Sequence, residues 1–295
     1  MSNHYQRTLS LAGIDISGLS VDDLRDLVRK ILEAKIHGIS FSPYVEGQGP
    51  GTQISAAQIR ERLAYIQPYV NWVRSFSCKE GNEQIPAIAA ENGLKTMVGV
   101  WLDEDREQNE VELANAIEVA KAGHANILAV GNEVLLRGEL SEDELIDYIN
   151  RAKQAVPGVP VGYVDAYFEF VDHPRVTEAC DVLLANCYPF WEGCPADHAL
   201  LYMKEMYRRV VNVANGKKVI ISETGWPNVG TATKGSVPSF ENAIKYFIDT
   251  YQWAEQDGIE IFYFSSFDET WKVDAEGDVG AYWGLWDKDG KPKYV

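Results

Sequence analysis

Long apolar segments are absent from this sequence of 295 residues. A membrane-spanning helix needs about 20 consecutive, predominantly apolar residues, and no such run occurs. The first ten residues are polar and mixed, without the apolar region of a signal peptide. We therefore expect a soluble chain without a membrane span. Its compartment stays open. The chain as written is typical of a cytoplasmic protein, but a periplasmic or secreted protein whose leader has been removed would have the same features.

Positive charge is scarce relative to negative charge. Lysine and arginine number 27 against 44 aspartates and glutamates, which gives a formal net charge of −17. Because such a surface repels phosphate groups, nucleic acid and anionic membranes are not expected as partners. A neutral partner meets no such repulsion. The acidic excess by itself indicates only solubility.

Cysteine is rare and is not spaced for metal binding. The four cysteines are Cys78, Cys180, Cys187 and Cys194. They form no C-x-x-C pair, and the nearby His173 and His198 show no ligand pattern. We expect free thiols, which favours a reducing compartment, with Cys187–Cys194 as the one candidate disulfide. No metal site and no organic cofactor is implied.

Short β-rich runs alternate with amphipathic stretches from Ile36 onward, which is typical of repeated βα units and a parallel sheet. The eight predicted strands are Ile36–Phe41, Val70–Phe76, Lys95–Trp101, Ile127–Val130, Val159–Val164, Val182–Cys187, Lys218–Ser222 and Ile259–Phe264. The predicted helices include Ser55–Tyr65, Asn109–Ala122, Ser141–Lys153, Ala199–Val213 and Ser239–Gln256. No linker rich in Pro, Gly or Ser divides the chain.

This pattern predicts an α/β fold of one domain, a (β/α)8 TIM barrel covering residues 1–295. Leu11–Ile16 is also strand-like, and Asp22–Lys35 has the pattern of a helix. We place both outside the ring of eight strands, so that residues 1–35 form an N-terminal extension packed on the barrel. Ser141 followed by Glu144 predicts a capping box at the start of its helix.

Two of the predicted strands end in a glutamate. Glu133 follows the apolar run that begins at Ile127, and Glu223 follows the run that begins at Lys218. A charged side chain at the end of a buried strand is costly unless it has a function. In (β/α)8 barrels the catalytic groups lie where the strands end. Strands four and seven face each other across the ring, so the two carboxylates would flank one sugar-sized substrate, as glycosidic cleavage requires. The alternative, a salt bridge from each glutamate to a barrel arginine, is weakened by finding both with aromatic neighbours.

Around these glutamates the sequence resembles glycoside hydrolase family 17. The family motifs Gly-Asn-Glu-Val and Ser-Glu-Thr-Gly-Trp-Pro are intact at Gly131–Val134 and Ser222–Pro227. The resemblance extends from about Ile36 to the C-terminus, with further family-like strand ends at Asn186–Gly193 and Phe267–Lys272.

Three segments look more like the bacterial branch of the family than like the plant endoglucanases. They are Gly131–Ser141, Phe41–Tyr44 and Gly280–Trp286. The resemblance to this branch, which includes glucanosyltransferases, implies activity on short laminari-oligosaccharides, with transfer between sugars as an alternative to hydrolysis.

The resemblance implies a retaining mechanism with Glu133 as acid/base and Glu223 as nucleophile, their carboxyl groups about 5–5.5 Å apart. It further implies that Asn132 binds the 2-hydroxyl of the sugar. Tyr188 is expected to hold Glu223 or to support the underside of the sugar ring. The alternative for Asn132 is a structural amide, and for Tyr188 it is packing at the top of the barrel.

Other family-like positions are expected to support the site or to bind sugar units. Glu269 and Lys272 resemble a supporting charged pair, although a surface salt bridge is the alternative. The plant enzymes carry a further carboxylate near their end, for which only Glu276 or Asp278 is available here. The remaining expected substrate-binding residues are Tyr44, Trp191, Trp226, Trp271 and Trp283. Trp101 and Trp286 also lie at predicted rims or loops of the barrel. About half of all these tryptophans are expected to be in the core. The other polar strand ends, each a possible subsite, are Glu46, Asp103, Asp165, Tyr167 and Glu192.

The expected function is a retaining glycosidase that cleaves β-1,3-glucosidic bonds in laminarin-type glucans or oligosaccharides, as a monomer. A β-1,3-glucanosyltransferase stays open, because the two differ only in whether water or a sugar hydroxyl reaches the glycosyl-enzyme. A non-catalytic glucan-binding barrel would have lost a carboxylate, and both are present. A Schiff-base aldolase barrel would need a lysine at a strand end, for which Lys272 is the sole candidate.

Overall fold

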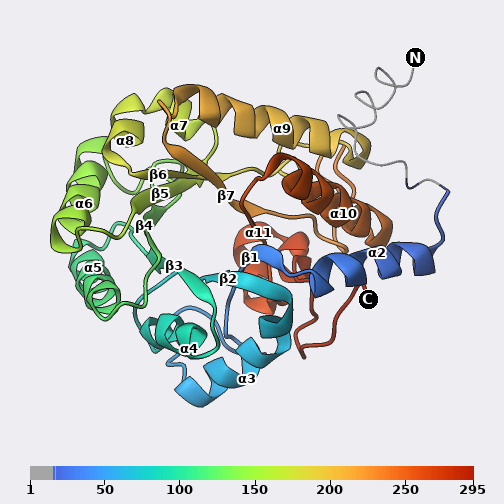
Figure 1. The fold of residues 1–295 in the computed structure, drawn as a ribbon, viewed down its shortest axis with the longest axis horizontal. Helices are drawn as coiled ribbons and strands as arrows, with labels where there is room; N and C mark the ends of the chain where they lie inside the picture. The colour runs from blue at the N-terminus through green and yellow to red at the C-terminus, as the bar shows by residue number, and fades with distance from the viewer. Residues whose placement is uncertain (1–15, 17) are drawn as a thin grey trace.

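Eight parallel strands close into a barrel in the computed structural model, which describes residue 16 and residues 18–295 (Figure 1). Each strand pairs with the next in sequence, and the last pairs with the first. The strands are β1 (Ile36–Ser40), β2 (Val70–Arg74), β3 (Lys95–Val100), β4 (Ile127–Asn132), β5 (Val161–Ala166), β6 (Val182–Asn186), β7 (Lys218–Thr224) and β8 (Ile261–Tyr263). The predicted (β/α)8 barrel is confirmed, and each predicted strand is present within a few residues.

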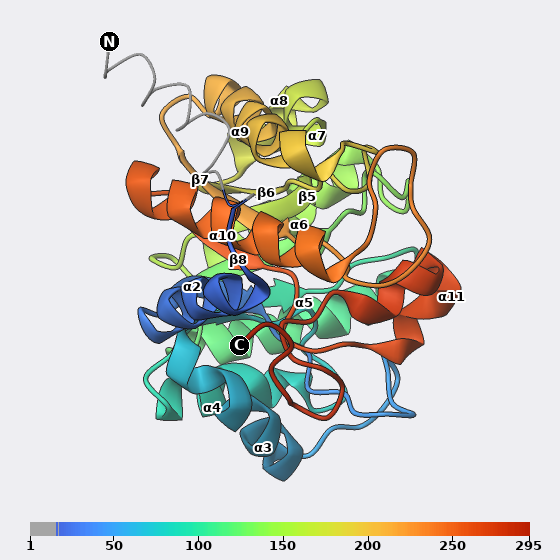
Figure 2. The same ribbon diagram turned by 90° about the vertical axis from the view of Figure 1, so that its right-hand side faces the viewer.

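Helices surround this barrel (Figures 1 and 2). The α-helices within the described residues are α2 (Val21–Glu33), α3 (Ala56–Ile66), α4 (Ile85–Glu91), α5 (Arg106–Lys121), α6 (Glu142–Ala155), α7 (Glu169–Asp172), α8 (Pro174–Ala179), α9 (Ala196–Val213), α10 (Phe240–Asp257) and α11 (Val273–Glu276). The 3-10 helices are η1 (Gln67–Tyr69), η2 (Asn82–Gln84), η3 (Thr270–Lys272) and η4 (Asp278–Tyr282). The predicted helices are all present, because their apolar residues recur with helical spacing.

Side-chain caps fix where several helices begin. The hydroxyls of Ser55 and Ser239 accept hydrogen bonds from backbone amides in the first turns of α3 and α10. Ser141 caps α6 in the same way, and the Glu144 carboxylate in return accepts a hydrogen bond from the Ser141 backbone amide. The capping box predicted from Ser141 and Glu144 is therefore confirmed.

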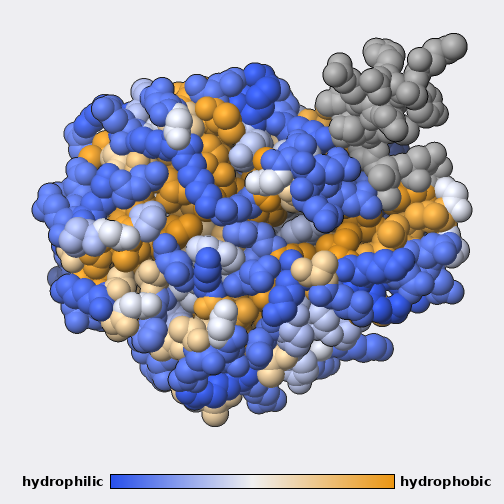
Figure 3. Space-filling view, in the orientation of Figure 1, coloured by the Kyte–Doolittle hydropathy of each residue, from blue (hydrophilic) through white to orange (hydrophobic). Residues whose placement is uncertain are grey.

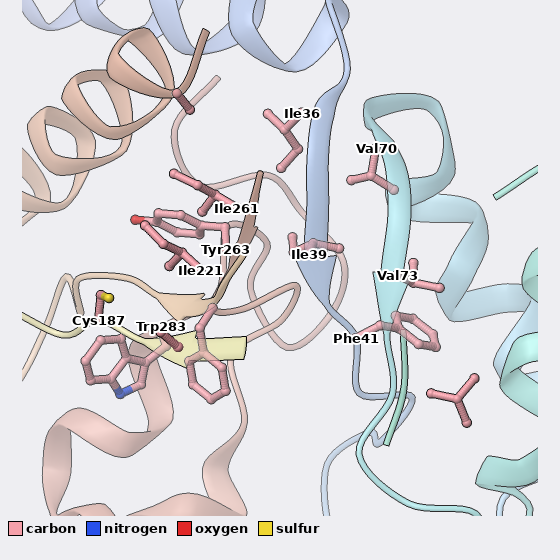
Figure 4. Close-up of a cluster of buried hydrophobic side chains, with 14 of the residues drawn as sticks. Ile36, Ile39, Phe41, Val70, Val73, Cys187, Ile221, Ile261, Tyr263 and Trp283 are labelled. Atoms are coloured by element: carbon pink, nitrogen blue, oxygen red, sulfur yellow. The ribbon is translucent and has the colours of Figure 1, made fainter. Parts of the chain in front are cut away.

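The apolar core has two layers, one inside the barrel and one between barrel and helices. The inner cluster consists of Met97, Ile127, Ala129, Val164, Val182, Leu184, Ile220 and Phe262. The Phe262 ring fills space over β1, where a Cβ on Gly38 would lie 2.6 Å from it, so only glycine fits there. Figure 4 shows part of the outer layer, with Ile36 and Ile39 of β1 beside Val70 and Val73 of β2.

Helix α2 lies against α10 in both ribbon views (Figures 1 and 2). It buries Leu24, Val28 and Leu32, which recur every four residues along one face. Within the predicted N-terminal extension, residues 1–15 and 17 lie outside the described residues. The strand-like run Leu11–Ile16 therefore falls almost wholly outside them, and Ile16 itself is not in a strand.

The described part of the chain contains no helix long and apolar enough to cross a membrane. All four cysteines lie within the described residues and all are free, which confirms the predicted thiols and leaves Cys187 and Cys194 unbonded. The face drawn in Figure 3 is mostly hydrophilic, as expected for a chain in which 24% of residues are charged.

Candidate active site

Both glutamates lie where a strand of the barrel becomes irregular. The pairing of β4 with β5 shifts register between Ala129 and Asn132, immediately before Glu133. The pairing of β6 with β7 shifts between Ala185 and Asn186, so that Asn186 faces Glu223. Such bulges redirect side chains at the rims of barrels. The backbone of Glu133 is left-handed, with φ of 55°, a conformation that is uncommon for residues other than glycine.

Glu133 and Glu223 line the same cleft, which has a volume of about 380 Å³. This is within the usual range of about 300–1,000 Å³ for small-molecule sites. Its aromatic lining consists of Tyr167, Phe168, Tyr188, Trp191, Phe264 and Trp283. The two carboxylates thus meet at one hollow with apolar faces, rather than in separate ion pairs away from any groove.

Glu223 is held by a cation and a hydroxyl. The Arg74 guanidinium at the end of β2 forms a buried ion pair with its Oε1. The Tyr188 hydroxyl donates a hydrogen bond to its Oε2 at 2.7 Å. Arg74 also donates to Oδ1 of Asn132 at 2.7 Å. Both oxygens of Glu223 are therefore fixed, and the negative charge that a nucleophilic carboxylate carries is balanced by Arg74.

Glu133 has a different environment. Burial and the negative charge of Glu223 raise the pKa of the Glu133 carboxyl above its usual range. Asn186 opposes this in part, because its Nδ2 donates a hydrogen bond to Glu133 Oε1 at 2.7 Å. Asn186 is itself oriented by the Ser222 hydroxyl, which donates to its Oδ1 at 2.8 Å. The raised pKa favours a protonated Glu133, as a general acid requires.

The replacement Asn186→Ala is expected to shift the pH profile of catalysis. Because the lost hydrogen bond favours ionised Glu133, the pKa of this carboxyl should rise further. Activity that needs protonated Glu133 falls as pH rises through that pKa, so the basic limb of kcat/KM should move to higher pH.

The control for this prediction is Asn71→Ala, which removes an amide that donates to the Ile36 carbonyl near the amino end of β1. The initial rates of both variants on a laminari-oligosaccharide are measured between pH 4 and 9. The pH profile of Asn71→Ala should keep the wild-type shape. A basic limb that stays in place or moves to lower pH in Asn186→Ala would contradict the assigned role of Asn186.

The predicted tryptophans divide into cleft walls and core. Trp191 is 40% exposed and lines the cleft with Trp283, whose ring centroid lies 5.5 Å away. Trp226, expected to bind substrate, is only 1% exposed, and its indole nitrogen donates to the Val237 carbonyl. It packs behind the cleft and offers no free face for a sugar. Trp286 is equally buried.

Glu269 and Lys272 form a buried ion pair at 2.6 Å rather than the alternative surface salt bridge. The indole nitrogen of Trp271 donates to Glu269 at 3.0 Å, and the ring of Tyr44 meets Trp271 edge-on. The Lys272 ammonium lies 3.9 Å from the ring centroid of Phe264, which lines the cleft. These four predicted residues form one group next to the cleft, without lining it themselves.

Two further carboxylates line the cleft, Glu192 from the loop after β6 and Glu276 from α11. Burial and the nearby Glu223 raise the pKa of Glu276 to about 7, although Lys272 opposes this. Asp278 instead accepts hydrogen bonds from Thr231 at the surface. Of the two residues considered for the further carboxylate, Glu276 is therefore the one at the site. The described residues include no group of three or more His, Cys, Asp or Glu arranged to hold a metal ion.

Arg74, Asn186 and Phe264 were not among the residues predicted for the site. Arg74 and Asn186 are the last residues of the apolar strands β2 and β6. A polar residue at the end of an apolar strand is the signal that identified Glu133 and Glu223. It did not identify Arg74 and Asn186, because the predicted strands Val70–Phe76 and Val182–Cys187 extend beyond them. Phe264 follows β8 as one more apolar residue, and nothing in its local sequence separates it from the core.

Comparison with known proteins gives consistent matches over most of the chain. The family model of the BtgE/BtgC glycoside hydrolase domain matches residues 38–284. The glucan 1,3-beta-glucosidase BGL2 of Candida albicans is 27% identical over 270 residues, which cover 83% of this chain and 87% of that protein.

Solved structures agree with this result. The glycoside hydrolase family 17 β-1,3-glucanosyltransferase of Rhizomucor miehei is 30% identical, with a TM-score of 0.79 over 88% of this chain and 96% of that chain. An active-site mutant of the same enzyme, 29% identical, is a complex with laminaritriose and has the same coverage and TM-score.

An endo-laminarinase from Formosa shares the fold, with 20% identity and a TM-score of 0.76 over 90% of this chain and 87% of that chain. The expected place in the bacterial branch stays a prediction, since the Candida and Rhizomucor relatives are fungal. The motifs at the two glutamates, the closed barrel and these matches agree, and the chain belongs to the BtgE/BtgC glycoside hydrolase domain family, within glycoside hydrolase family 17.

Proposed function

We propose that this protein cleaves β-1,3-glucosidic bonds of laminarin-type glucans by double displacement. The observation that carries the proposal is the pair of glutamates in one cleft with opposite surroundings: Glu223 is paired with a cation, and Glu133 is desolvated with a raised pKa. The relatives support the substrate class, because they are a glucan 1,3-beta-glucosidase and a β-1,3-glucanosyltransferase solved with laminaritriose. The protein acts as a monomer in this proposal.

In the first step a Glu223 carboxylate oxygen attacks the anomeric carbon, and the bond from that carbon to the glycosidic oxygen breaks. Glu133 gives its proton to the departing oxygen, which leaves as a sugar hydroxyl. The product is a glycosyl-enzyme with an ester at Glu223. Arg74 and Tyr188 fix the two oxygens of Glu223, so that the attacking carboxylate does not rotate away from the anomeric carbon.

In the second step Glu133 acts as a base. The negative charge of Glu223 disappears when the ester forms, so one cause of the raised pKa of Glu133 is removed and the pKa falls. Ionised Glu133 takes a proton from a water or sugar hydroxyl, whose oxygen attacks the anomeric carbon and releases Glu223. Two inversions at this carbon give overall retention.

Asn132 is positioned to recognise the sugar during both steps. Its Oδ1 accepts from Arg74, which fixes the amide plane and leaves the NH₂ group to donate. In our proposal this group binds the 2-hydroxyl, an interaction that strengthens as the oxocarbenium-like transition state forms.

Transfer to a sugar hydroxyl is the second candidate outcome of the same mechanism. The observation in its favour is the similarity to the Rhizomucor miehei β-1,3-glucanosyltransferase, which extends over 88% of this chain. The exposed face of Trp191 at the cleft suits stacking of an acceptor sugar, which would compete with water for the glycosyl-enzyme.

Incubation with laminaripentaose tests these proposals together. Wild-type protein should give shorter products by hydrolysis and longer ones by transfer, resolved by mass spectrometry, with β-configured new reducing ends by NMR. Glu223→Ala should give neither, whereas Glu107→Ala, a change on the exposed face of α5, should match wild type. An α-configured first product would overturn double displacement, and binding without turnover by wild type would favour a non-catalytic glucan-binding barrel.

A further inference from the structure

Behind Glu133 lies a buried polar pair that the mechanism above does not use. Tyr163 and Asp165 are both 0% exposed. They lie two residues apart on β5, so their side chains leave the same face of the strand. The Tyr163 hydroxyl donates a hydrogen bond to Asp165 Oδ2. A carboxylate enclosed to this extent is costly, and burial raises the pKa of Asp165 to about 7.

The partners of this pair are the backbone amides that follow Glu133. The amide of Leu135 donates to the Tyr163 hydroxyl at 3.0 Å. The amide of Leu136 donates to Asp165 Oδ2 at 3.4 Å. The other carboxylate oxygen, Oδ1, accepts the amide of Ala166 at 2.7 Å, which fixes the orientation of Asp165. The pair therefore holds the turn that follows the acid/base residue Glu133 in the chain.

Strand β5 also holds the chain before and at Glu133. The ring of Tyr163 packs on Gly131, where an added Cβ would lie 3.2 Å from the ring. The amide of Glu133 itself donates to the Val164 carbonyl at 2.8 Å. The segment from Gly131 to Leu136 is thus fixed by β5 on both sides of Glu133. This fixation coincides with the left-handed backbone of Glu133, a conformation that surrounding contacts must maintain.

We propose that Tyr163 and Asp165 are positioning residues that hold Glu133 at the distance and orientation for proton transfer. The inference rests on the proposed function, in which Glu133 is the acid/base. A general acid must lie within hydrogen-bond reach of the atom that it protonates. A displacement of about 1 Å from that geometry is enough to cost roughly 100-fold in rate. Neither residue touches the substrate in this proposal.

The test compares rates on two substrates with different leaving groups, because a good leaving group departs without needing a proton from the general acid. Tyr163→Phe keeps the ring on Gly131 and removes only the hydroxyl. It should lower kcat/KM on laminaritriose by roughly 10- to 100-fold. On a 2,4-dinitrophenyl β-laminaribioside, whose phenolate leaves unprotonated, the loss should be below roughly 3-fold. Because kcat/KM reports the steps up to the glycosyl-enzyme, the comparison isolates the acid role.

Three further variants complete the experiment. Tyr251→Phe removes another buried tyrosine hydroxyl, one that donates to the Gly38 carbonyl, and should not change the ratio of the two rates. Glu133→Gln should lose far more on laminaritriose than on the aryl glycoside. Asp165→Asn should resemble Tyr163→Phe and replaces it if circular dichroism shows that Tyr163→Phe is unfolded.

The outcomes separate this inference from the proposed function. If Glu133→Gln loses activity equally on both substrates, Glu133 is not the acid and the proposed function fails. If Glu133→Gln behaves as expected but Tyr163→Phe and Asp165→Asn lose nothing, or lose equally on both substrates, the pair has only a structural role and the inference is overturned.

Discussion

Glu223→Ala is expected to lower kcat on laminari-oligosaccharides by roughly 10⁴- to 10⁶-fold, because the first displacement then has no nucleophile. The truncation leaves a gap beside the anomeric carbon, on the face from which Glu223 attacks. Azide should enter it and restore turnover of an aryl β-laminaribioside with a good leaving group. Because only one displacement then occurs, the product should be the α-glycosyl azide, which NMR identifies.

Glu133→Ala is the matched control for this prediction. Here Glu223 still forms the glycosyl-enzyme, and azide attacks in the second step, so two displacements give the β-glycosyl azide. The stereochemistry of the two products assigns the roles independently of their rates. A β-azide from Glu223→Ala together with an α-azide from Glu133→Ala would reverse the assignment of nucleophile and acid/base.

The barrel could be predicted from sequence because parallel strands covered on both faces are nearly continuous apolar runs. The limits of these strands depend on features with weaker signals. β5 begins at Val161 and not at Val159, because Pro160 lacks the amide that a ladder needs. β4 and β7 extend two residues beyond their predicted ends, through register shifts that no local pattern predicts.

The candidate site was only partly predictable, for a similar reason. Glu133 and Glu223 stand out as charges that end apolar runs, which is a local signal. Whether a tryptophan in a loop is exposed depends on which side chains from other strand ends pack against its ring. Trp226 is covered by Phe190 from the loop after β6, with ring centroids 5.2 Å apart, whereas Trp191, the next residue along from Phe190, remains exposed.

The contact between Arg74 and Glu223 likewise joins residues 149 positions apart. Arg74 has a dual role in the structure, since the same guanidinium pairs with Glu223 and orients Asn132. The guanidinium is almost fully enclosed and lies over the ring of Phe76, 4.4 Å from its centroid. Such a group links the stability of the barrel to the chemistry of its cleft.

Arg74→Met is expected to reduce the free energy of unfolding by about 3–5 kcal/mol, because it leaves the buried carboxylate of Glu223 without its cation. The reciprocal change, Glu223→Gln, leaves Arg74 unpaired and should also destabilise. In the double variant both charges are gone, so most of the lost stability should return. Urea denaturation of the four proteins at pH 7 measures this coupling.

Arg60→Met is the control for the coupling, because Arg60 pairs with Glu91 at 3.0 Å on the surface, where both side chains are more than half exposed. Its cost should be at most about 1 kcal/mol. Activity gives the second readout, since the double variant should regain stability but remain without turnover. If the losses of Arg74→Met and Glu223→Gln simply add, the two charges do not stabilise one another, and the ion pair holds Glu223 in place without contributing to the fold.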